Sequence, residues 1–197
     1  MAKVPSDVAF TPAVKAIQQE KGSRATYERM ERGGGWQTEV TPDLAKFLAM
    51  LDMFYLGTAT AEGQPYIQYR GGTPGFLKPI GPKTLAFADF GGNRQYVSIG
   101  NLSENPRAIL FLMDYENRRR VKVWGHARVV DDDQELIAQL ADPAYPAAPE
   151  RAFVFDIEAW DINCPQHIHR RYPAAAVNAK IQALEAEIAE LKQRLGE

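Results

Sequence analysis

The stretch of chain over residues 87–107 carries the side chains best placed to bind an anion. It reads FADFGGNRQYVSIGNLSENPR, which predicts a strand that breaks at Gly91–Gly92 and a helix that begins at Asn93 and ends near Asn101. The side-chain oxygen of Asn93 can accept hydrogen bonds from the free amides of the first helical turn. The guanidinium of Arg94 would then lie beside the positive end of the helix, a position that suits a phosphate. The pattern predicts a phosphate-binding corner; the alternative is that Arg94 is simply solvated.

A second group of reactive side chains lies near the end of the chain, where Cys164, His167 and His169 fall within six residues. Thiolate and imidazole are good metal ligands. A dedicated site also needs a fourth ligand or an open position, and alternate residues of an extended segment point apart, so we predict no metal site. Two alternatives remain: His167 activates Cys164 as a nucleophile or redox group, or this segment closes the fold or borders a ligand cleft beside Trp160. We favour the second.

Composition and charge restrict the class of protein. Of the 197 residues, 45% are hydrophobic and 24% are charged, as in an ordinary globular protein. The formal net charge of -2 argues against bulk attraction to nucleic acid. The sequence has no apolar run near the roughly 20 residues that span a bilayer, no recognisable signal peptide, and a single cysteine that cannot form an internal disulfide. Together these features predict a cytoplasmic protein.

The first part of the chain, residues 1–40, is polar and broken. Two short helices are predicted at residues 14–21 and 25–32, and the segment has too few apolar residues to form a core of its own. We therefore expect an arm that packs on another part of the protein. The glycines at 33–35 predict a flexible break; the alternative is close approach to a cofactor.

The central part, residues 41–173, has the pattern of a small β-domain. Thr41 can cap a helix and Pro42 fits its first position. Strands are predicted over residues 54–60, 65–70, 76–79, 84–89, 108–113, 120–130 and 152–161. Within residues 120–130 one face alternates as Val121, Val123, Ala127 and Val129. A further helix follows a cap at residues 131–133. Short strands with tight connections predict a mainly β protein with flanking helices, built on an antiparallel barrel.

Four segments in order resemble the FMN-binding split barrel of the pyridoxamine 5'-phosphate oxidase-like superfamily. They read LGTATAEGQPYIQYR, TLAFADFGGNRQ, NLSENPRAILFLMD and RRVKVWGHARVV. The tail W-D-x-N-C-P-Q-H-I, from Trp160 to Ile168, is similar to that of a bacterial subgroup. The resemblance implies an antiparallel split β-barrel over residues 41–173 and a homodimer that holds FMN at the subunit interface.

The resemblance also implies which residues meet the cofactor. The family's phosphate-binding Ser-Arg-Lys falls on residues 93–95, so its lysine is replaced by glutamine and other cations must contribute. The expected cofactor-binding residues are Arg70, Lys78, Ala88, Asp89, Asn93, Arg94, Gln95, Arg120, Trp160, Cys164 and His167. If the register slips by one residue, Arg119 replaces Arg120. Trp124 would either contact the flavin or be a surface aromatic covered by the arm or by the partner.

The end of the chain, residues 174–197, has an apolar repeat with alternating spacings of four and three. Ile181 and Ile188 fall at a positions of a heptad, and Leu184 and Leu191 fall at d positions. This combination favours a parallel two-stranded coiled coil, with residues 180 and 187 at g positions facing residues 185 and 192 of the partner. The alternative is a helix packed on its own barrel.

The sequence thus predicts an FMN-dependent oxidoreductase acting on a small molecule. Pyridoxamine phosphate is not the expected substrate, because WDINCPQHIHRRY replaces the family's substrate-phosphate segment. No catalytic residue is assigned. The alternatives are a flavin carrier or sensor without turnover, or a relative that uses haem or a deazaflavin.

Overall fold

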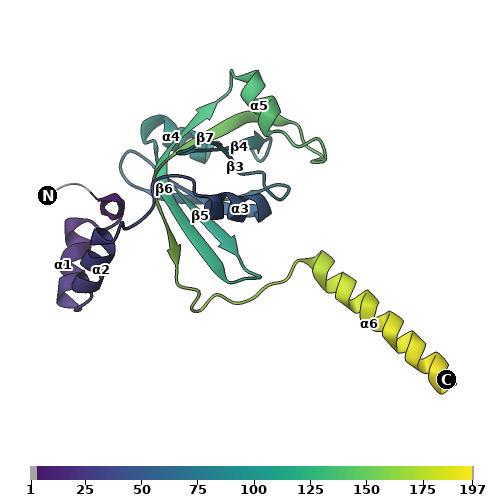
Figure 1. The fold of residues 1–197 in the computed structure, drawn as a ribbon. Helices are drawn as coiled ribbons and strands as arrows, with labels where there is room; N and C mark the ends of the chain where they lie inside the picture. The colour runs from purple at the N-terminus through teal and green to yellow at the C-terminus, as the bar shows by residue number, and fades with distance from the viewer. Residues whose placement is uncertain (1–3, 197) are drawn as a thin grey trace. The chain divides into compact units, whose positions relative to one another are not determined.

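The structure is a computed structural model that describes residues 4–196 (Figure 1). It divides into two units. The first comprises the chain up to Met113 together with Arg120–Asn163, and the second comprises Asp114–Arg119 together with the residues from Cys164 onward. The first unit contains the barrel, and the second contains the C-terminal helix.

The described helices and strands follow the predicted order. The helices are a short 3-10 helix at Pro5–Val8, then α1 (Pro12–Glu20), α2 (Arg24–Arg32), α3 (Pro42–Met50), α4 (Val97–Glu104), α5 (Gln134–Leu140) and α6 (Ala174–Leu195). The strands are β1 (Met53–Ala59), β2 (Pro65–Gly71), β3 (Lys78–Gly81), β4 (Thr84–Phe90), β5 (Arg107–Asp114), β6 (Arg119–Val130) and β7 (Pro149–Asn163). Among the helices within residues 4–196, none is long and apolar enough to cross a membrane.

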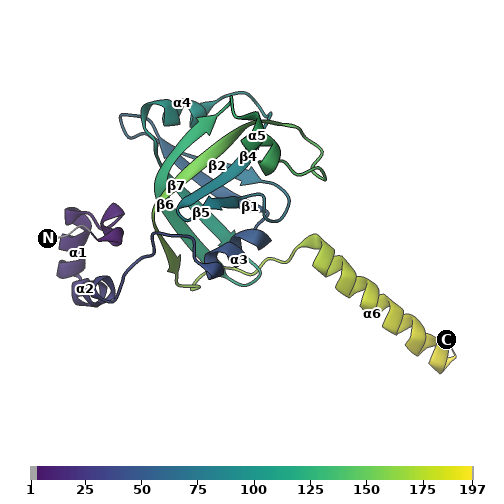
Figure 2. The same cartoon turned by 45° about the horizontal axis from the view of Figure 1, so that its top comes forward.

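All seven strands belong to one curved sheet with the order β2-β1-β5-β6-β7-β4-β3 (Figure 2). β1 pairs antiparallel with β2 and with β5, and β7 pairs antiparallel with β6 and with β4. β2 and β4 are not neighbours in the hydrogen-bonded order, yet Arg70 of β2 forms an ion pair with Asp89 of β4. The barrel is therefore split between these two strands, which confirms the predicted antiparallel split barrel.

Aromatic and leucine side chains fill the barrel. The rings of Phe87 and Phe153 stack with their centroids 5.1 Å apart, and Phe54 meets Phe87 edge to face. The predicted alternation in β6 is confirmed, because Val121, Val123 and Ala127 are buried.

Two helices cover parts of the barrel. α3 buries Leu44, Phe47 and Leu48 in the main core, and the Thr41 hydroxyl accepts a hydrogen bond from the Leu44 amide at 3.2 Å, as the capping pattern predicts. α5 packs Ile137 and Leu140 against small residues of β4 and β7 in a second cluster.

Two predicted boundaries were wrong. The helix predicted from Asn93 begins at Val97 and continues to Glu104. The Asn93 side chain does not cap it, because its Oδ1 instead accepts from the Gln95 amide at 3.2 Å in a local turn. The strand predicted at residues 76–79 lies at Lys78–Gly81, because Phe76 and Leu77 are buried in the core ahead of the strand.

The N-terminal segment packs on the barrel through aromatic rings. Trp36 stacks on Trp124 of β6 with centroids 4.6 Å apart and ring planes 10° apart, and Phe10 packs on Trp36 at 5.0 Å. The Gln37 amide donates to the Trp160 carbonyl at 3.2 Å and extends the sheet by an isolated bridge. Trp124 is therefore a surface aromatic covered by the arm.

The close packing between β6 and β7 depends on Gly125. The register of the two strands shifts between Trp124 and Gly125, and a Cβ at Gly125 would lie 2.0 Å from the Asp156 carbonyl oxygen. By contrast, a Cβ at Gly100 in α4 would meet nothing within 4 Å.

These two glycines make a matched test of the barrel. Gly125→Ala should lower the free energy of unfolding by about 2–4 kcal/mol, because the backbone of β7 must move to accept the methyl group. Gly100→Ala should leave it unchanged or raise it by up to about 1 kcal/mol, because alanine favours a helix interior. Urea unfolding of both variants measures the difference. Equal unfolding midpoints for Gly125→Ala and the natural chain would contradict the close approach of Gly125 to the β7 backbone.

Candidate functional site

A cavity of about 310 Å³ lies where β2, β4, the start of β7 and the glycine turn meet α4. The residues that line it are Tyr66, Gln68, Arg70, Asp89, Phe90, Gly92, Asn93, Arg94, Gln95, Tyr96, Val97, Ser98, Ile99, Glu150 and Arg151. Five predicted cofactor-binding residues are thus brought together here: Arg70 from β2, and Asp89, Asn93, Arg94 and Gln95 from a segment that begins 19 residues later. We call this space the polar cavity.

A buried ion-pair network forms the floor of the polar cavity. Asp89 is buried and accepts hydrogen bonds from Arg70 on one oxygen and from Arg151 on the other, the second at 3.3 Å. Arg151 also donates through Nε to Asp131 at 2.8 Å. The Arg70 guanidinium carbon lies 4.7 Å from the centroid of Phe153, so the cation rests on the aromatic core.

Arg70 keeps one unused donor. Its Nε is buried and has no hydrogen-bond partner among the described residues. A buried donor without a partner costs free energy unless a ligand or water satisfies it. Counting side chains that line the cavity, three arginines face two carboxylates, Asp89 and Glu150, which leaves one net positive charge. The donor set therefore fits an anion that can accept several hydrogen bonds.

The corner that carries Arg94 has an unusual backbone. Arg94 and Tyr96 have positive φ values of 58° and 54°, in the left-handed region that non-glycine residues seldom adopt. The helix that follows is fixed to the barrel, since Ser98 donates to Gln68 at 2.7 Å and Asn101 donates to Thr58 at 3.0 Å. Such strain persists only where the surroundings hold it, and it is common at ligand sites. Arg94 itself is exposed at the cavity.

A second cavity of about 500 Å³ adjoins the first. Both cavities share Gln68, Arg70, Asp89, Phe90 and Gly92, so the Arg70–Asp89 pair is a common wall. The remaining lining residues of the second cavity are Asp52, Tyr69, Gly71, Gly72, Phe76, Phe87, Ala88 and Tyr145. We call it the aromatic cavity because five of its lining side chains are tyrosines or phenylalanines.

The chemistry of the aromatic cavity is that of a planar, partly polar ligand. Partial desolvation, with a smaller contribution from Asp52, raises the pKa of Tyr69, so its hydroxyl is neutral at physiological pH. Tyr145 packs on Phe90 with ring centroids 4.6 Å apart and brings the loop after α5 to the cavity. Flat aromatic surfaces and a few hydrogen-bonding groups are typical of sites for ring ligands.

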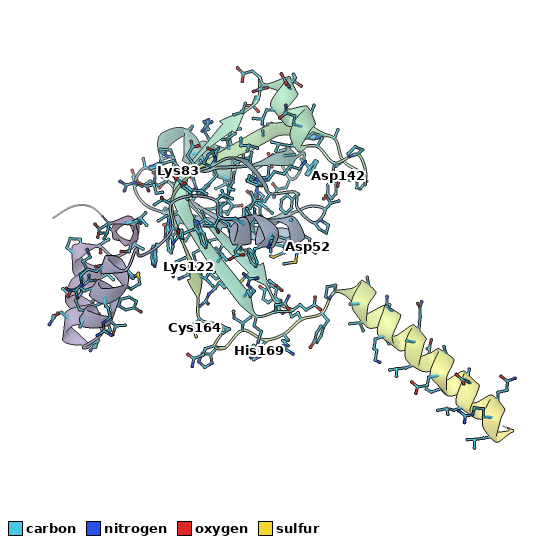
Figure 3. The ribbon with its side chains drawn as sticks, viewed as in Figure 1. Asp52, Lys83, Lys122, Asp142, Cys164 and His169 are labelled. Carbon is cyan, nitrogen blue, oxygen red and sulfur yellow. The ribbon has the colours of Figure 1, made fainter. Side chains whose placement is uncertain are left out.

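The loop that carries Tyr145 is held by Asp142 and Lys78. The Asp142 carboxylate accepts from Thr73 and, at 2.8 Å, from the Ala144 amide; these bonds, with a smaller effect of Lys78, lower its pKa. Lys78 donates to the carbonyl oxygens of Gln139 and Leu140 at the end of α5. Figure 3 labels Asp142 in this loop and Asp52, which directly precedes β1. Lys78 therefore lies outside both cavities and supports the loop.

Of the other predicted residues, Ala88 lines the aromatic cavity, whereas Arg120, Trp160, Cys164 and His167 line neither cavity. Arg120 lies over Phe111 at 5.8 Å. Trp160 is buried in the core, where its Nε1 donates to the Glu39 carbonyl at 2.8 Å. Cys164 and His167 belong to the second unit and are exposed (Figure 3 labels Cys164). Within residues 4–196, no cluster of three or more histidine, cysteine or acidic side chains could hold a metal ion.

Sequence reasoning missed Arg151, Glu150 and Tyr145. Arg151 lines the polar cavity together with Arg70 and Arg94, yet it lies more than 50 residues beyond the corner. Its one sequence signal is a charge at the start of a strand that is otherwise apolar, and that signal also occurs at ordinary exposed strand ends. Tyr145 lies in an irregular loop, for which periodicity predicts no direction.

The network around Asp89 can be tested against an exposed ion pair. Asp89→Asn should lower the free energy of unfolding by about 2–4 kcal/mol, because it leaves two partly buried guanidinium groups without their charged partner. The control is Asp156→Asn, which removes an Arg128 pair whose two side chains are 57% and 50% exposed and should cost less than about 1 kcal/mol. Denaturant unfolding of both variants measures the effects, and equal losses would contradict a special role for Asp89.

Comparisons with known proteins agree with this architecture. A sequence model of the family described as pyridoxamine 5'-phosphate oxidase matches residues 40–164, more than half of the chain. No curated protein matches. Among solved structures, HupZ of Group A Streptococcus superposes with a TM-score of 0.51 at 16% identity, covering 68% of this chain and 99% of HupZ.

Two further solved structures superpose less closely. A protein of Clostridium acetobutylicum related to general stress protein 26, of the pyridoxinephosphate oxidase family, has a TM-score of 0.46 at 16% identity and covers 60% of this chain and 83% of its own. An FMN-binding protein of Syntrophomonas wolfei has a TM-score of 0.46 at 17% identity and covers 77% of this chain and 95% of its own. With the family match over residues 40–164, the chain belongs to the pyridoxamine 5'-phosphate oxidase family.

Proposed function

We propose that the two adjoining cavities hold FMN and that the protein is an FMN-dependent oxidoreductase. The observation that carries the proposal is the shared wall: the Arg70–Asp89 pair lies between a polar cavity whose lining side chains carry a net positive charge and an aromatic cavity. A ligand with an anionic end and a planar ring matches both halves of this space. Their volumes of about 310 and 500 Å³ lie in the usual range for small-molecule sites.

In this proposal the chain's own residues divide the work of binding. Arg94 and the polar groups of Asn93 and Gln95 receive the phosphate, and the charge that the family's lysine would supply comes from Arg70 and Arg151. The aromatic cavity receives the ring. When bound, FMN would supply the redox chemistry by accepting and releasing an electron pair.

The other residues of the aromatic cavity would orient the ring and limit its contact with water. The neutral hydroxyl of Tyr69 offers a hydrogen bond without adding charge. Tyr145, on its anchored loop, adds an aromatic wall from a different part of the chain. We assign no general acid or base.

We further propose that the working form is a homodimer with its site at the subunit interface. The outer face of β2 supports this, since Ile67 and Tyr69 are 70% and 59% exposed and lie beside Tyr55 of β1. Large apolar side chains gathered on an uncovered strand are typical of protein contacts. Tyr69 lines the aromatic cavity as well, so a partner on this strand would also narrow the site.

Two alternatives to FMN turnover remain specific enough to test. A carrier or sensor would hold FMN in the same cavities without passing electrons. A deazaflavin or haem could occupy a barrel of this fold, and the absorption spectrum of the loaded protein would distinguish these ligands from FMN.

The phosphate assignment predicts a selective loss of affinity. Arg94→Ala should weaken FMN binding about tenfold and leave riboflavin binding unchanged, because only FMN carries the phosphate. A tenfold loss is the lower end of the range for a charge-assisted hydrogen bond, and we expect it because Arg94 is exposed. The matched control is Arg107→Ala, an exposed arginine outside both cavities. Titration by quenching of flavin fluorescence measures both ligands. Unchanged FMN affinity in Arg94→Ala would overturn the assignment.

The enzyme and the carrier make different predictions for the FMN-loaded protein. If the protein is an oxidoreductase, NADH or NADPH should bleach the visible flavin bands faster than it bleaches free FMN, and air should restore them. The control is the same concentration of FMN without protein. Bleaching no faster than that of free FMN with either nicotinamide would favour the carrier.

A further inference from the structure

The C-terminal helix α6 exposes a continuous apolar stripe. None of its 22 residues is buried. Its apolar side chains keep exposed fractions of 42% at Val177, 47% at Ile181, 43% at Leu184, 53% at Ile188, 46% at Leu191 and 75% at Leu195. A helix of this length gains little stability alone in water, so a partner for the stripe would be its main source of stability.

The spacing of the stripe is that of a coiled coil. Val177, Leu184 and Leu191 occupy d positions of successive heptads, and Ile181 and Ile188 occupy a positions. Isoleucine at a with leucine at d favours a parallel two-stranded arrangement over trimers and tetramers.

The charges beside the stripe distinguish the two possible orientations. In a parallel pair in register, Lys180 faces Glu185 of the partner subunit and Glu187 faces Lys192 of the partner subunit, and each contact occurs twice with opposite charges.

In the antiparallel pair with the same apolar layers, residue 191 opposes residue 181 and residue 184 opposes residue 188. Glu185 and Glu187 would then each face their own copies, and Lys180 would face Arg194. Lys192 would face the neutral Asn178, and every pair of two charged residues would be of like sign, which is destabilising. Among the pairs that keep all of these apolar layers, the charges are opposite in the parallel orientation and alike in the antiparallel one, so they favour the parallel pair.

We propose that α6 is a dimerisation helix whose partner is α6 of a second copy of this chain, parallel and in register. Three heptads give a weak contact by themselves. Because the helix is attached to the barrel, its pairing adds a second contact to any pairing of two barrels. Once the barrels have met, the two helices are held at a high effective concentration, so even a weak helix contact strengthens the dimer. The proposal does not depend on what the cavities bind.

Disulfide trapping in the full-length chain tests both pairing and orientation. Cys164→Ser removes the natural thiol, and Leu191→Cys then places one cysteine at a d position. Oxidised glutathione is the oxidant: two thiols join as one disulfide while it is reduced to two molecules of glutathione. The matched control is Ala186→Cys, which lies on the opposite side of the helix.

The parallel pair predicts that Leu191→Cys chains link to themselves rapidly and nearly completely, whereas Ala186→Cys chains do not. Linking only in a mixture of Leu191→Cys and Ile181→Cys chains would show an antiparallel pair and overturn the proposal. No more linking than in the Ala186→Cys control would show that α6 does not pair and would also overturn it.

A charge exchange gives an independent readout. Lys180→Glu should weaken the dimer about two- to tenfold, measured by sedimentation, because both copies of one ion pair become like-charged. Adding Glu185→Lys to the same chain reverses the pair and should restore the affinity. Failure of the double variant to recover would contradict the parallel register.

Discussion

The ion pair between Arg70 and Asp89 is the interaction on which the rest of this structure depends. β2 and β4 approach each other without sharing backbone hydrogen bonds, so side chains must close the barrel there. Asp89 can be buried because two arginines, Arg70 and Arg151, compensate for its desolvation. The aromatic core under Arg70 fixes the guanidinium further. The same pair is the wall between the two cavities, so closing the barrel also shapes the site.

This arrangement separates support from recognition. Asp89 occupies one side of the Arg70 guanidinium and Phe153 lies beneath it, leaving its Nε unsatisfied. Arg94 is instead exposed on a corner with left-handed backbone at residues 94 and 96. The buried network thus forms part of the wall of the polar cavity, while the corner provides an exposed cation. Proteins of one fold family can bind different cofactors, and in this chain the donor set of the two cavities suits an anionic ligand.

The parts of the chain outside the barrel have separate physical roles. The N-terminal segment places Trp36 over Trp124 on the outer surface of β6, and without this cover Trp124 would be in contact with water. α5 covers small residues of β4 and β7, and the loop after it delivers Tyr145 to the aromatic cavity. α6 buries none of its residues within its own chain and presents its apolar stripe outward.

The sequence by itself determined the strands other than β3, the Thr41 cap of α3 and the heptad of α6, because each follows from local periodicity or from one side chain and the adjacent amides. It also identified Arg70, Asp89 and Arg94 as site residues that the structure brings together. Only the tertiary structure decided that α4 begins at Val97, since backbone geometry at the corner occupies the Asn93 oxygen. It alone brought Arg151 and Tyr145 to the cavities, because curvature of the sheet unites residues that no local pattern connects.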